Sequence, residues 1–144
     1  MKAVRFHEFG DPGVLRHEDV EQPEPGPGEV RLRVAGSAFN PVDDGIRGGY
    51  LQEPFPVTLP HTPGIEVSGR VDALGEGVDD VAVGDAVIGF LPMTAPGAAA
   101  EFALAPAGAV RVDVSARYPL ADLARVHELS AAGGIRGKVV ITIA

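Results

Sequence analysis

Residues 60–90 constrain the fold most, because they hold two strand patterns joined by a glycine-rich turn. The patterns cover residues 65–74 and 82–90, and Gly75-Glu76-Gly77 lies between them. A Gly-x-Gly pair could also begin a dinucleotide-binding loop, but that loop needs a third glycine and a following helix. Here the third position is Asp80, whose carboxylate would repel phosphate, and the next pattern is again a strand. The segment therefore predicts a turn between strands.

Short strand patterns recur over the first 106 residues. In residues 29–35 the apolar side chains alternate with period two, so one face of that strand should be buried. With 19 Gly and 13 Pro, the chain has many turn-forming residues and room only for short strands. We predict a mainly β fold, a partly open barrel with short helices and one C-terminal helix. The remaining expected strands are residues 2–9, 14–20 and 100–105, and the buried face of 29–35 is Val30, Leu32 and Val34.

The carboxyl end has the pattern of a helix followed by a strand. A helix is expected at residues 120–131, because Pro119 suits its first position and an apolar stripe follows at helical spacing. Gly133-Gly134 should end that helix. The unbroken apolar run at residues 138–143 predicts a strand that is buried on both faces. The stripe is Leu120, Leu123, Val126 and Leu129.

Length, charge and composition exclude several classes of protein. A chain of 144 residues has the usual size of one globular domain. Its net charge of −8 argues against a nucleic-acid partner, which needs clustered basic residues. No apolar run approaches the ~20 residues that span a bilayer, so we expect no membrane partner and a cytoplasmic location. The absence of cysteine excludes disulfides and thiol chemistry.

Four motifs in sequence order carry a family resemblance. The first, Gly64-Ile65-Glu66-Val67-Ser68-Gly69, could by itself be a strand whose glycine lets another backbone approach. With the three motifs that follow it, however, the chain resembles the catalytic domain of the medium-chain dehydrogenase/reductase superfamily over nearly its whole length. The resemblance implies a GroES-like barrel. The other motifs are Gly75-Glu76-Gly77-Val78, Val83-Gly84-Asp85-Ala86-Val87 and Ala100-Glu101-Phe102.

The resemblance also implies a domain organisation. Residues 109–144, with Arg136-Gly137-Lys138-Val139-Val140, resemble the carboxyl end of the family, which returns to the catalytic domain. We therefore expect residues 1–144 to form a single GroES-like catalytic domain, made of residues 1–106 and the returning segment 109–144. The nucleotide-binding (Rossmann) domain, which the family inserts between these two parts, would be absent near residues 107–108.

Zinc is not expected in this chain. Zinc-dependent members of the family carry a histidine where this chain has Ile65, and a catalytic zinc needs about three Cys, His, Asp or Glu ligands. No two of the four histidines are spaced like metal ligands, and His61 is expected to be an ordinary loop histidine. The four are His7, His17, His61 and His127.

Residues 40–50 hold the candidate site. Asn40-Pro41-Val42-Asp43, with Arg47 and Tyr50, resembles the Asn-x-x-Asp-x-x-x-Arg-x-Gly-x-Tyr stretch of zinc-independent quinone oxidoreductases. The resemblance implies that Asn40, Asp43, Arg47 and Tyr50 are catalytic. Asn40 would face the nicotinamide of the cofactor, and Tyr50 would hydrogen-bond a substrate carbonyl.

A structural explanation of the same residues stays open. Asn40 could cap a short helix, and Asp43 could pair with Arg47 at helical i,i+4 spacing. Gly45 stands where many relatives have a tyrosine, so part of the aromatic wall of the substrate pocket would be missing.

The resemblance implies hydride transfer from NADPH to a quinone or an activated alkene such as an enone. Without the domain that holds NADPH, we expect the chain to bind no cofactor and to be inactive alone. Two alternatives remain, a small-molecule-binding module without turnover and a structural GroES-like protein. Because relatives commonly dimerise through the nucleotide-binding domain, a monomer with a small-molecule partner is expected.

Overall fold

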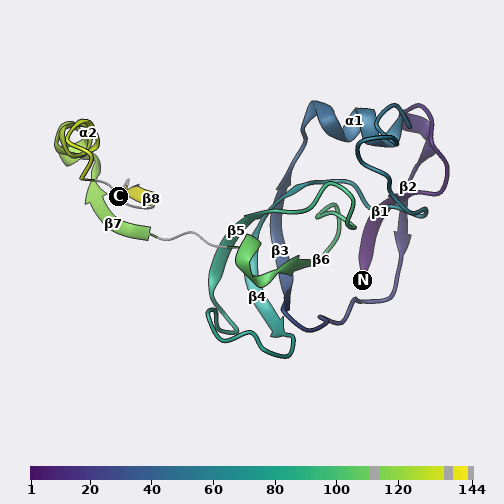
Figure 1. Ribbon diagram of the computed structural model, residues 1–144, viewed down its shortest axis with the longest axis horizontal. Coiled ribbons are helices and arrows are strands. Elements are labelled where there is room, and N and C mark those ends of the chain that lie inside the picture. Colours follow the sequence, from purple (N-terminus) through teal and green to yellow (C-terminus); the bar gives the residue numbers. More distant parts are fainter. Residues whose placement is uncertain (111–113, 135–137, 143–144) are drawn as a thin grey trace. The chain divides into compact units, whose positions relative to one another are not determined.

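The computed structural model describes residues 1–110, 114–134 and 138–142. The chain divides into two compact units, Met1–Arg111 and Val112–Ala144 (Figure 1). That residues 109–144 return to the N-terminal part stays a prediction.

The first unit consists of two antiparallel sheets (Figure 1). β1 and β2 form a hairpin, and the larger sheet has the strand order β5-β4-β3-β6. Two isolated bridges, Ala3 to Ala100 and Phe6 to His61, join β1 to the rest of the unit. The strands confirm the prediction of a mainly β fold. The described sheets do not close into a barrel. The strands are β1 (Lys2–Phe6), β2 (Leu15–Asp19), β3 (Glu29–Ala38), β4 (Glu66–Leu74), β5 (Ala86–Phe90) and β6 (Phe102–Pro106).

The described part of the first unit also contains three short helices, of which the first two connect strands and the third follows β6. They are η1 (Pro12–Val14), α1 (Pro41–Arg47) and η2 (Ala107–Ala109). α1 confirms the helical turn expected in residues 40–50, and it places several polar side chains next to the end of β3.

The connection between β4 and β5 is longer than the sequence pattern suggests. The strand expected at residues 82–90 begins only at Ala86, because residues 82–85 form a turn. In that turn the N–H of Ala82 donates to Asp85 Oδ2 at 2.9 Å, and the N–H of Asp85 donates to the Ala82 carbonyl at 3.1 Å. Gly75-Glu76-Gly77 is a turn, as predicted, and a Cβ on Gly75 would lie 1.8 Å from the carbonyl oxygen of Gly26.

Two apolar clusters form the core of the first unit. The larger cluster lies on the inner face of the four-stranded sheet, and the predicted face of β3 contributes to it with Val30 and Leu32 fully buried and Val34 partly buried. The smaller cluster, between β1 and α1, contains Phe6, Ile46 and Val57. Alternation in the strands explains the first cluster, since successive side chains point to opposite faces.

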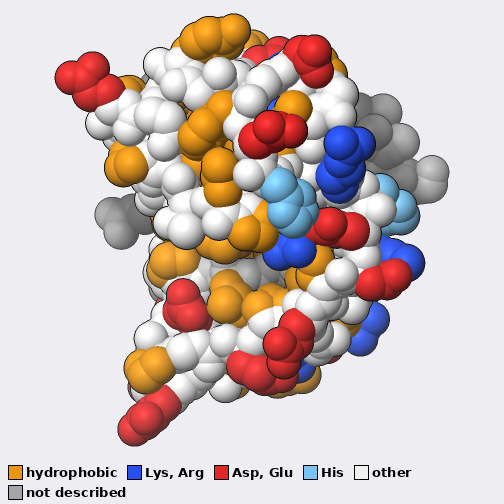
Figure 2. Space-filling view, turned by 90° about the vertical axis from the view of Figure 1, so that its right-hand side faces the viewer, with side chains coloured by type: hydrophobic (Ala, Val, Ile, Leu, Met, Phe, Trp, Pro, Cys, Tyr) orange, Lys and Arg blue, Asp and Glu red, His pale blue; other side chains and the backbone are white. Residues whose placement is uncertain are grey.

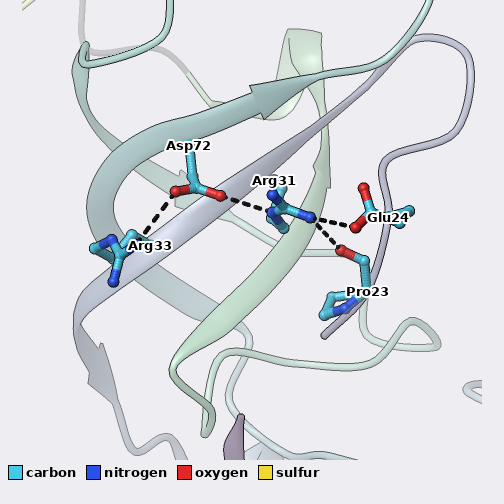
Figure 3. Close-up of polar contacts among 5 residues, drawn as sticks. All are labelled: Pro23, Glu24, Arg31, Arg33 and Asp72. Atoms are coloured by element: carbon cyan, nitrogen blue, oxygen red, sulfur yellow. Dashed lines mark hydrogen bonds and ion pairs between the residues drawn. The ribbon is translucent and has the colours of Figure 1, made fainter. Parts of the chain in front are cut away.

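An ion-pair network joins the outer face of this sheet to the proline-rich segment before β3. Asp72 lies between two arginines, accepting from Arg31 Nε at 2.7 Å and facing Arg33 Nη2 at 3.5 Å (Figure 3). Arg31 also donates to Glu24 at 2.8 Å and to the Pro23 carbonyl at 3.1 Å. The pKa of Arg31 is raised, chiefly by its hydrogen bond to Asp72. The network therefore fastens residues 23–24 to β3 and β4.

The side of the first unit that carries β1 and β2 has mixed charge. Acidic, basic and hydrophobic side chains are interspersed over it (Figure 2). Two of its ion pairs are Lys2 with Asp19 at 2.6 Å and Arg5 with Glu18 at 2.5 Å. None of the helices among the described residues is long and apolar enough to cross a membrane.

The second unit is a β-α-β arrangement. β7 (Val114–Pro119) and β8 (Lys138–Thr142) are parallel, and η3 (Leu120–Asp122) leads into α2 (Leu123–Ala131) between them. The helix expected at residues 120–131 is confirmed, although its first turn is 3₁₀, and the final strand is confirmed as far as Thr142. Its predicted burial on both faces is wrong for the side chains that the structure describes, because Val139 and Ile141 are only partly buried and Thr142 is exposed. No strand was expected at the position of β7.

Gly133 ends α2, as predicted. It has φ of 69°, its N–H donates to the Ser130 carbonyl, and the N–H of Gly134 donates to the Leu129 carbonyl at 2.9 Å. These two bonds form a Schellman motif, in which the left-handed residue is usually glycine. Of the carboxyl motif at residues 136–140, only the part from Lys138 falls within the described residues.

Candidate functional site

Two hollows meet at the end of β3, where Ser37 and Ala38 line both of them. The first has a volume of about 570 Å³ and the second about 390 Å³. Pockets of this size hold small molecules in other proteins. The pair is therefore the candidate binding cleft of the first unit.

The first hollow lies on the outer face of the four-stranded sheet. Its apolar walls come from β5, where Ile88 is 47% and Phe90 52% exposed. Its polar side chains are Ser37 on β3 and Glu66 and Ser68 on β4, and the hydroxyl of Ser68 donates to the Gly36 carbonyl at 3.2 Å. The described lining residues are Gly36, Ser37, Ala38, Glu66, Val67, Ser68, Ile88, Gly89, Phe90 and Ala109.

The second hollow lies between α1 and the start of β2. Leu15 and Phe39 contribute exposed apolar side chains to it, and Asp43, Asp44 and Arg47 contribute charged ones. Its polar side chains are already hydrogen-bonded within the protein, as the Ser37 hydroxyl is to the Glu66 carbonyl at 2.8 Å. The hollow therefore suits an apolar ring better than a ligand that needs many polar partners.

Asn40 and Asp43 fix the start of α1. Asn40 is the N-cap residue, as the structural explanation predicted, and its N–H donates to Asp43 Oδ2 at 2.8 Å. The other oxygen of Asp43 accepts the N–H of Gly64 at 3.0 Å. Asp43 is only 7% exposed, so both bonds are shielded from water. Asp43 thus holds α1 to the segment before β4.

The Nδ2 atom of Asn40 is buried and has no hydrogen-bond partner among the described residues. An unpaired buried donor costs free energy unless a ligand or water satisfies it. Asn40 follows Phe39, which lines the second hollow, but Asn40 itself lines neither hollow.

The expected pairing of Asp43 with Arg47 is wrong. Arg47 Nη2 donates to Asp44 at 2.8 Å, and Arg47 Nη1 donates to the carbonyl of Gly10. The i,i+4 spacing favoured Asp43, but the backbone N–H groups of Asn40 and Gly64 already occupy its carboxylate. Arg47 instead ties the end of α1 to the loop after β1.

The structure does not bring Tyr50 into either hollow. Its side chain is 86% exposed, and its ring lies against Gly48, where a Cβ would be 2.4 Å from the ring. Counting from Asn40, the tyrosine of the Asn-x-x-Asp-x-x-x-Arg-x-Gly-x-Tyr pattern falls on Leu51, one position after Tyr50. The earlier alignment of Tyr50 with that tyrosine is therefore wrong by one residue.

Leu51 also explains why Gly45 has no side chain. Leu51 packs against the smaller apolar cluster, and a Cβ on Gly45 would lie 2.6 Å from Leu51 Cδ1. Leucine therefore fills the space next to the position at which many relatives have a tyrosine. Gly45 and Leu51, the two positions at which the family pattern has a tyrosine, therefore both lack a hydroxyl group in this chain.

His61 lies near the site but is part of the core. It is 4% exposed, its ring meets Phe6 edge-on with centroids 5.4 Å apart, and its backbone pairs with Phe6. Burial lowers the pKa of His61, and the nearby charge of Asp43 opposes this effect. The expectation of an ordinary loop histidine missed its burial, which apolar neighbours in the tertiary structure cause.

The position of the family's zinc-site histidine does not fit a metal. Ile65 is 5% exposed and offers no donor side chain, and its carbonyl accepts the N–H of Leu91 at 2.6 Å. Within the described ranges, no group of three His, Asp or Glu side chains could hold a metal ion. The donor chemistry there therefore does not support a zinc site.

The residues of the first hollow were not predicted from the sequence to be part of a site. Glu66 and Ser68 belong to the motif that indicated the family, but their outward orientation depends on the pairing of β4 with β5. Strand alternation in residues 65–74 could have indicated which residues share a face. It could not show that Ile88 and Phe90 lie beside them.

The curved sheet, the capped helix α1 and the two hollows define a GroES-like domain of the kind that occurs in alcohol dehydrogenases. The family model of the alcohol dehydrogenase GroES-like domain matches residues 26–113, and the chain belongs to this family. The match includes every described residue of the first hollow and all of α1.

Several known proteins with similar sequences and structures are quinone oxidoreductases. The chain is 43% identical over 107 residues to a quinone oxidoreductase of Lama guanicoe. The matched region covers 73% of this chain and 31% of that protein. A mycobacterial quinone oxidoreductase structure has 40% identity and a TM-score of 0.67, and covers 76% of this chain and 32% of that one. The Escherichia coli quinone oxidoreductase, solved in complex with NADPH, has 25% identity and a TM-score of 0.68 over 77% of this chain and 32% of that one.

These comparisons confirm the resemblance to quinone oxidoreductases of the medium-chain dehydrogenase/reductase superfamily for the N-terminal part. The chain spans about a third of the length of these relatives.

Proposed function

We propose that these 144 residues form the substrate-side lobe of an NADPH-dependent oxidoreductase that reduces quinones or activated alkenes. The family match over residues 26–113 carries the proposal, because it includes the first hollow and α1. In such a reaction NADPH supplies the hydride, and the protein supplies binding and orientation. The lobe would bind the acceptor ring in the cleft at the end of β3.

The residues at the cleft have distinct roles in this proposal. The unpaired Nδ2 of Asn40 would donate to a carbonyl oxygen of the nicotinamide or of the acceptor. Asp43 and Arg47 hold α1 in place through their bonds to Gly64 and Gly10, so they position Asn40. Tyr50 has no direct contact with the acceptor in this proposal, because it is not among the residues that line the hollows.

We expect this chain alone to have no reductase activity. The Gly75-Glu76-Gly77 turn packs against residues 26–29, with the N–H of Gly75 on the Glu29 carbonyl at 2.8 Å and that of Gly28 on the Glu76 carbonyl at 2.9 Å. Gly75 therefore serves backbone packing, and Gly77 provides the positive φ of the turn. The turn presents no phosphate cradle, which requires free N–H groups at a helix N-terminus. Because relatives commonly dimerise through the nucleotide-binding domain, the lobe would be a monomer.

Calorimetry with NADPH, followed by an assay with 1,4-naphthoquinone, tests the proposal. We expect no heat from NADPH and no turnover, but an increase in thermal stability with the quinone, since a ligand that binds only the folded state stabilises it. Ala38→Phe should reduce this increase by filling the point where the hollows meet, whereas Ala82→Phe, at another exposed alanine, should not. NADPH-dependent turnover would disprove the inactivity of the lobe, and no quinone effect in any variant would disprove the substrate role.

A small-molecule-binding module without redox function is the second candidate. The polar side chains of the second hollow favour it, because they are hydrogen-bonded within the protein. They are therefore suited to a hollow that binds an apolar ligand and catalyses no reaction. Equal stabilisation by 1,4-naphthoquinone and by the less activated ketone 1-tetralone would support this module. A preference for the quinone would support the oxidoreductase lobe.

A further inference from the structure

Arg33 and Arg70 lie directly opposite each other on neighbouring strands of the four-stranded sheet. β3 and β4 pair them in register, so their backbones are roughly 5 Å apart. Like charges at opposed positions of a sheet repel and destabilise the pair. Two facing arginines in a chain of net charge −8 are therefore an unusual local concentration of positive charge.

Both arginines point to the outer face of the sheet, the face of the first hollow. Val67 and Val71 of β4 are buried, and alternation therefore directs Ser68 and Arg70 outward. Ser68 pairs with Ile88 and lines the first hollow, and Arg70 is two residues further along the strand, roughly 7 Å away. The arginine pair thus lies beside one end of the hollow.

Neither guanidinium is saturated by carboxylates. Arg33 is 67% exposed, stacks on Phe102 at 4.7 Å from the ring centroid, and faces Asp72 only at 3.5 Å (Figure 3). Asp72 has its shorter bond, 2.7 Å, with Arg31. Arg70 donates to the Gly84 carbonyl at 2.8 Å, and no ion pair within the described part of the chain includes it.

The carboxylates near the hollow set the direction in which a ligand would lie. Glu66 lines the opposite end of the hollow, four residues from Arg70 and so roughly 13 Å away along the strand. Near the arginines, Asp85 precedes Ala86, which is the strand partner of Arg70, and one oxygen of Asp85 accepts the N–H of Ala82. Asp85 and Asp72 therefore offset part of the positive charge at the arginine end, whereas only negative charge is present among the described residues at the Glu66 end.

We propose that Arg33 and Arg70 form an anion subsite for an amphipathic ligand whose apolar ring lies in the first hollow against Ile88 and Phe90. The ligand is a small molecule with one anionic group, such as a sulfonate, carboxylate or phosphate, on an apolar ring. Arginine suits this role because its planar guanidinium donates two parallel hydrogen bonds to such groups and stacks on aromatic rings, as Arg33 does on Phe102. The inference rests on the proposed function for the hollow and adds the charge of the preferred ligand.

Two fluorescent probes with the same ring system test the subsite. 8-Anilinonaphthalene-1-sulfonate carries the anionic group, and N-phenyl-1-naphthylamine lacks it. In the double variant Arg33→Gln/Arg70→Gln, the affinity for the sulfonate should fall about tenfold, since each lost charged contact at an exposed site costs a factor of a few. The affinity for the neutral amine should change less than about twofold.

The controls separate a local contact from the net charge. Arg16→Gln removes one exposed positive charge on β2 and should leave both affinities unchanged. Arg33→Lys/Arg70→Lys keeps the charge and should recover part of the sulfonate affinity. Raising the salt from about 0.05 M to about 0.5 M should weaken the sulfonate alone, because the Debye length falls severalfold.

Each other outcome counts against one of the proposals. Unchanged sulfonate affinity in the Arg33→Gln/Arg70→Gln variant would overturn the subsite and leave the hollow intact. Equal loss of both probes would show that the arginines shape the hollow and do not bind the anion, which also overturns the subsite. If neither probe binds the unaltered chain, both the subsite and the hollow of the proposed function fail.

Discussion

The carboxylate of Asp43 accepts the backbone N–H of Gly64, 21 residues further along the chain, at 3.0 Å. The same carboxylate accepts the N–H of Asn40 at 2.8 Å, so one buried side chain joins the start of α1 to the segment that precedes β4. Asp43 and Gly64 both line the second hollow, so this bond connects two parts of its wall.

Removing that carboxylate should therefore destabilise the first unit. Asp43→Ala leaves two shielded N–H groups without acceptors, and we expect a loss of about 2–4 kcal/mol in the free energy of unfolding. Urea denaturation measures it. The matched control on the same helix is Asp44→Ala, which removes a largely exposed partner of Arg47 and should cost about 0–1 kcal/mol. Equal losses in the two variants would contradict the special position of Asp43.

Gly75 should not tolerate a side chain. A Cβ there would lie 1.8 Å from the carbonyl oxygen of Gly26, and backbone atoms cannot move aside as a flexible side chain can. Gly75→Ala should lower the free energy of unfolding by about 2 kcal/mol or more. Gly108→Ala, at a glycine with open space around its Cβ position, is the control and should be close to neutral. Thermal unfolding of the two variants decides the matter.

Gly45 and Leu51 should be energetically coupled. Gly45→Ala alone brings a Cβ to 2.6 Å from Leu51 Cδ1, so steric strain should cancel most of the gain of about 1 kcal/mol that alanine normally brings to a helix. In a Leu51→Ala background, the same substitution should stabilise the protein. A double-mutant cycle measured by urea denaturation gives the coupling, for which we expect about 1 kcal/mol. Additive effects would show that the two positions are independent.

The stability of the first unit should fall because of His61 as the pH drops below about 6.5, the ordinary pKa of a histidine. Burial lowers the pKa of this side chain in the folded state, so the unfolded state binds the proton more readily. The stabilisation is complete above the unfolded pKa and is lost as the pH falls towards the lower folded pKa. His61→Asn should flatten the pH dependence of the urea midpoint in this range, although it lowers the stability itself. The exposed His17→Asn provides the comparison, and an unchanged slope in His61→Asn would refute the assignment.

Much of the fold could be predicted from local patterns in the sequence. Period-two alternation identified β3 and its buried face, and the glycines at 75–77 and 133–134 marked a turn and a helix end, because these features depend on a few neighbouring residues. The start of β5 was predicted four residues too early. The hydrogen bond from the Ala82 N–H to the Asp85 side chain, which forms a turn there, is not visible in the strand pattern.

The candidate site was predictable only in part. The residues of α1 could be identified from their resemblance to the quinone oxidoreductases, but the partners of their side chains could not. Helical spacing favoured Asp43 as the partner of Arg47, whereas the structure gives Asp44 and Gly10 that place. The choice depends on which acceptors the neighbouring segments bring close, and no local pattern contains that information.

The sequence by itself determined the family and the mainly β architecture and indicated the segment that carries the candidate site, because periodicity and motif spacing are local properties. Only the tertiary structure decided that Asp43 holds Gly64, that Leu51 fills the space over Gly45 and that Arg33 faces Arg70 beside an apolar hollow. These relationships follow from strand register and from the packing of residues 6 to 37 positions apart in the chain, in which a shift of one residue would change every partner.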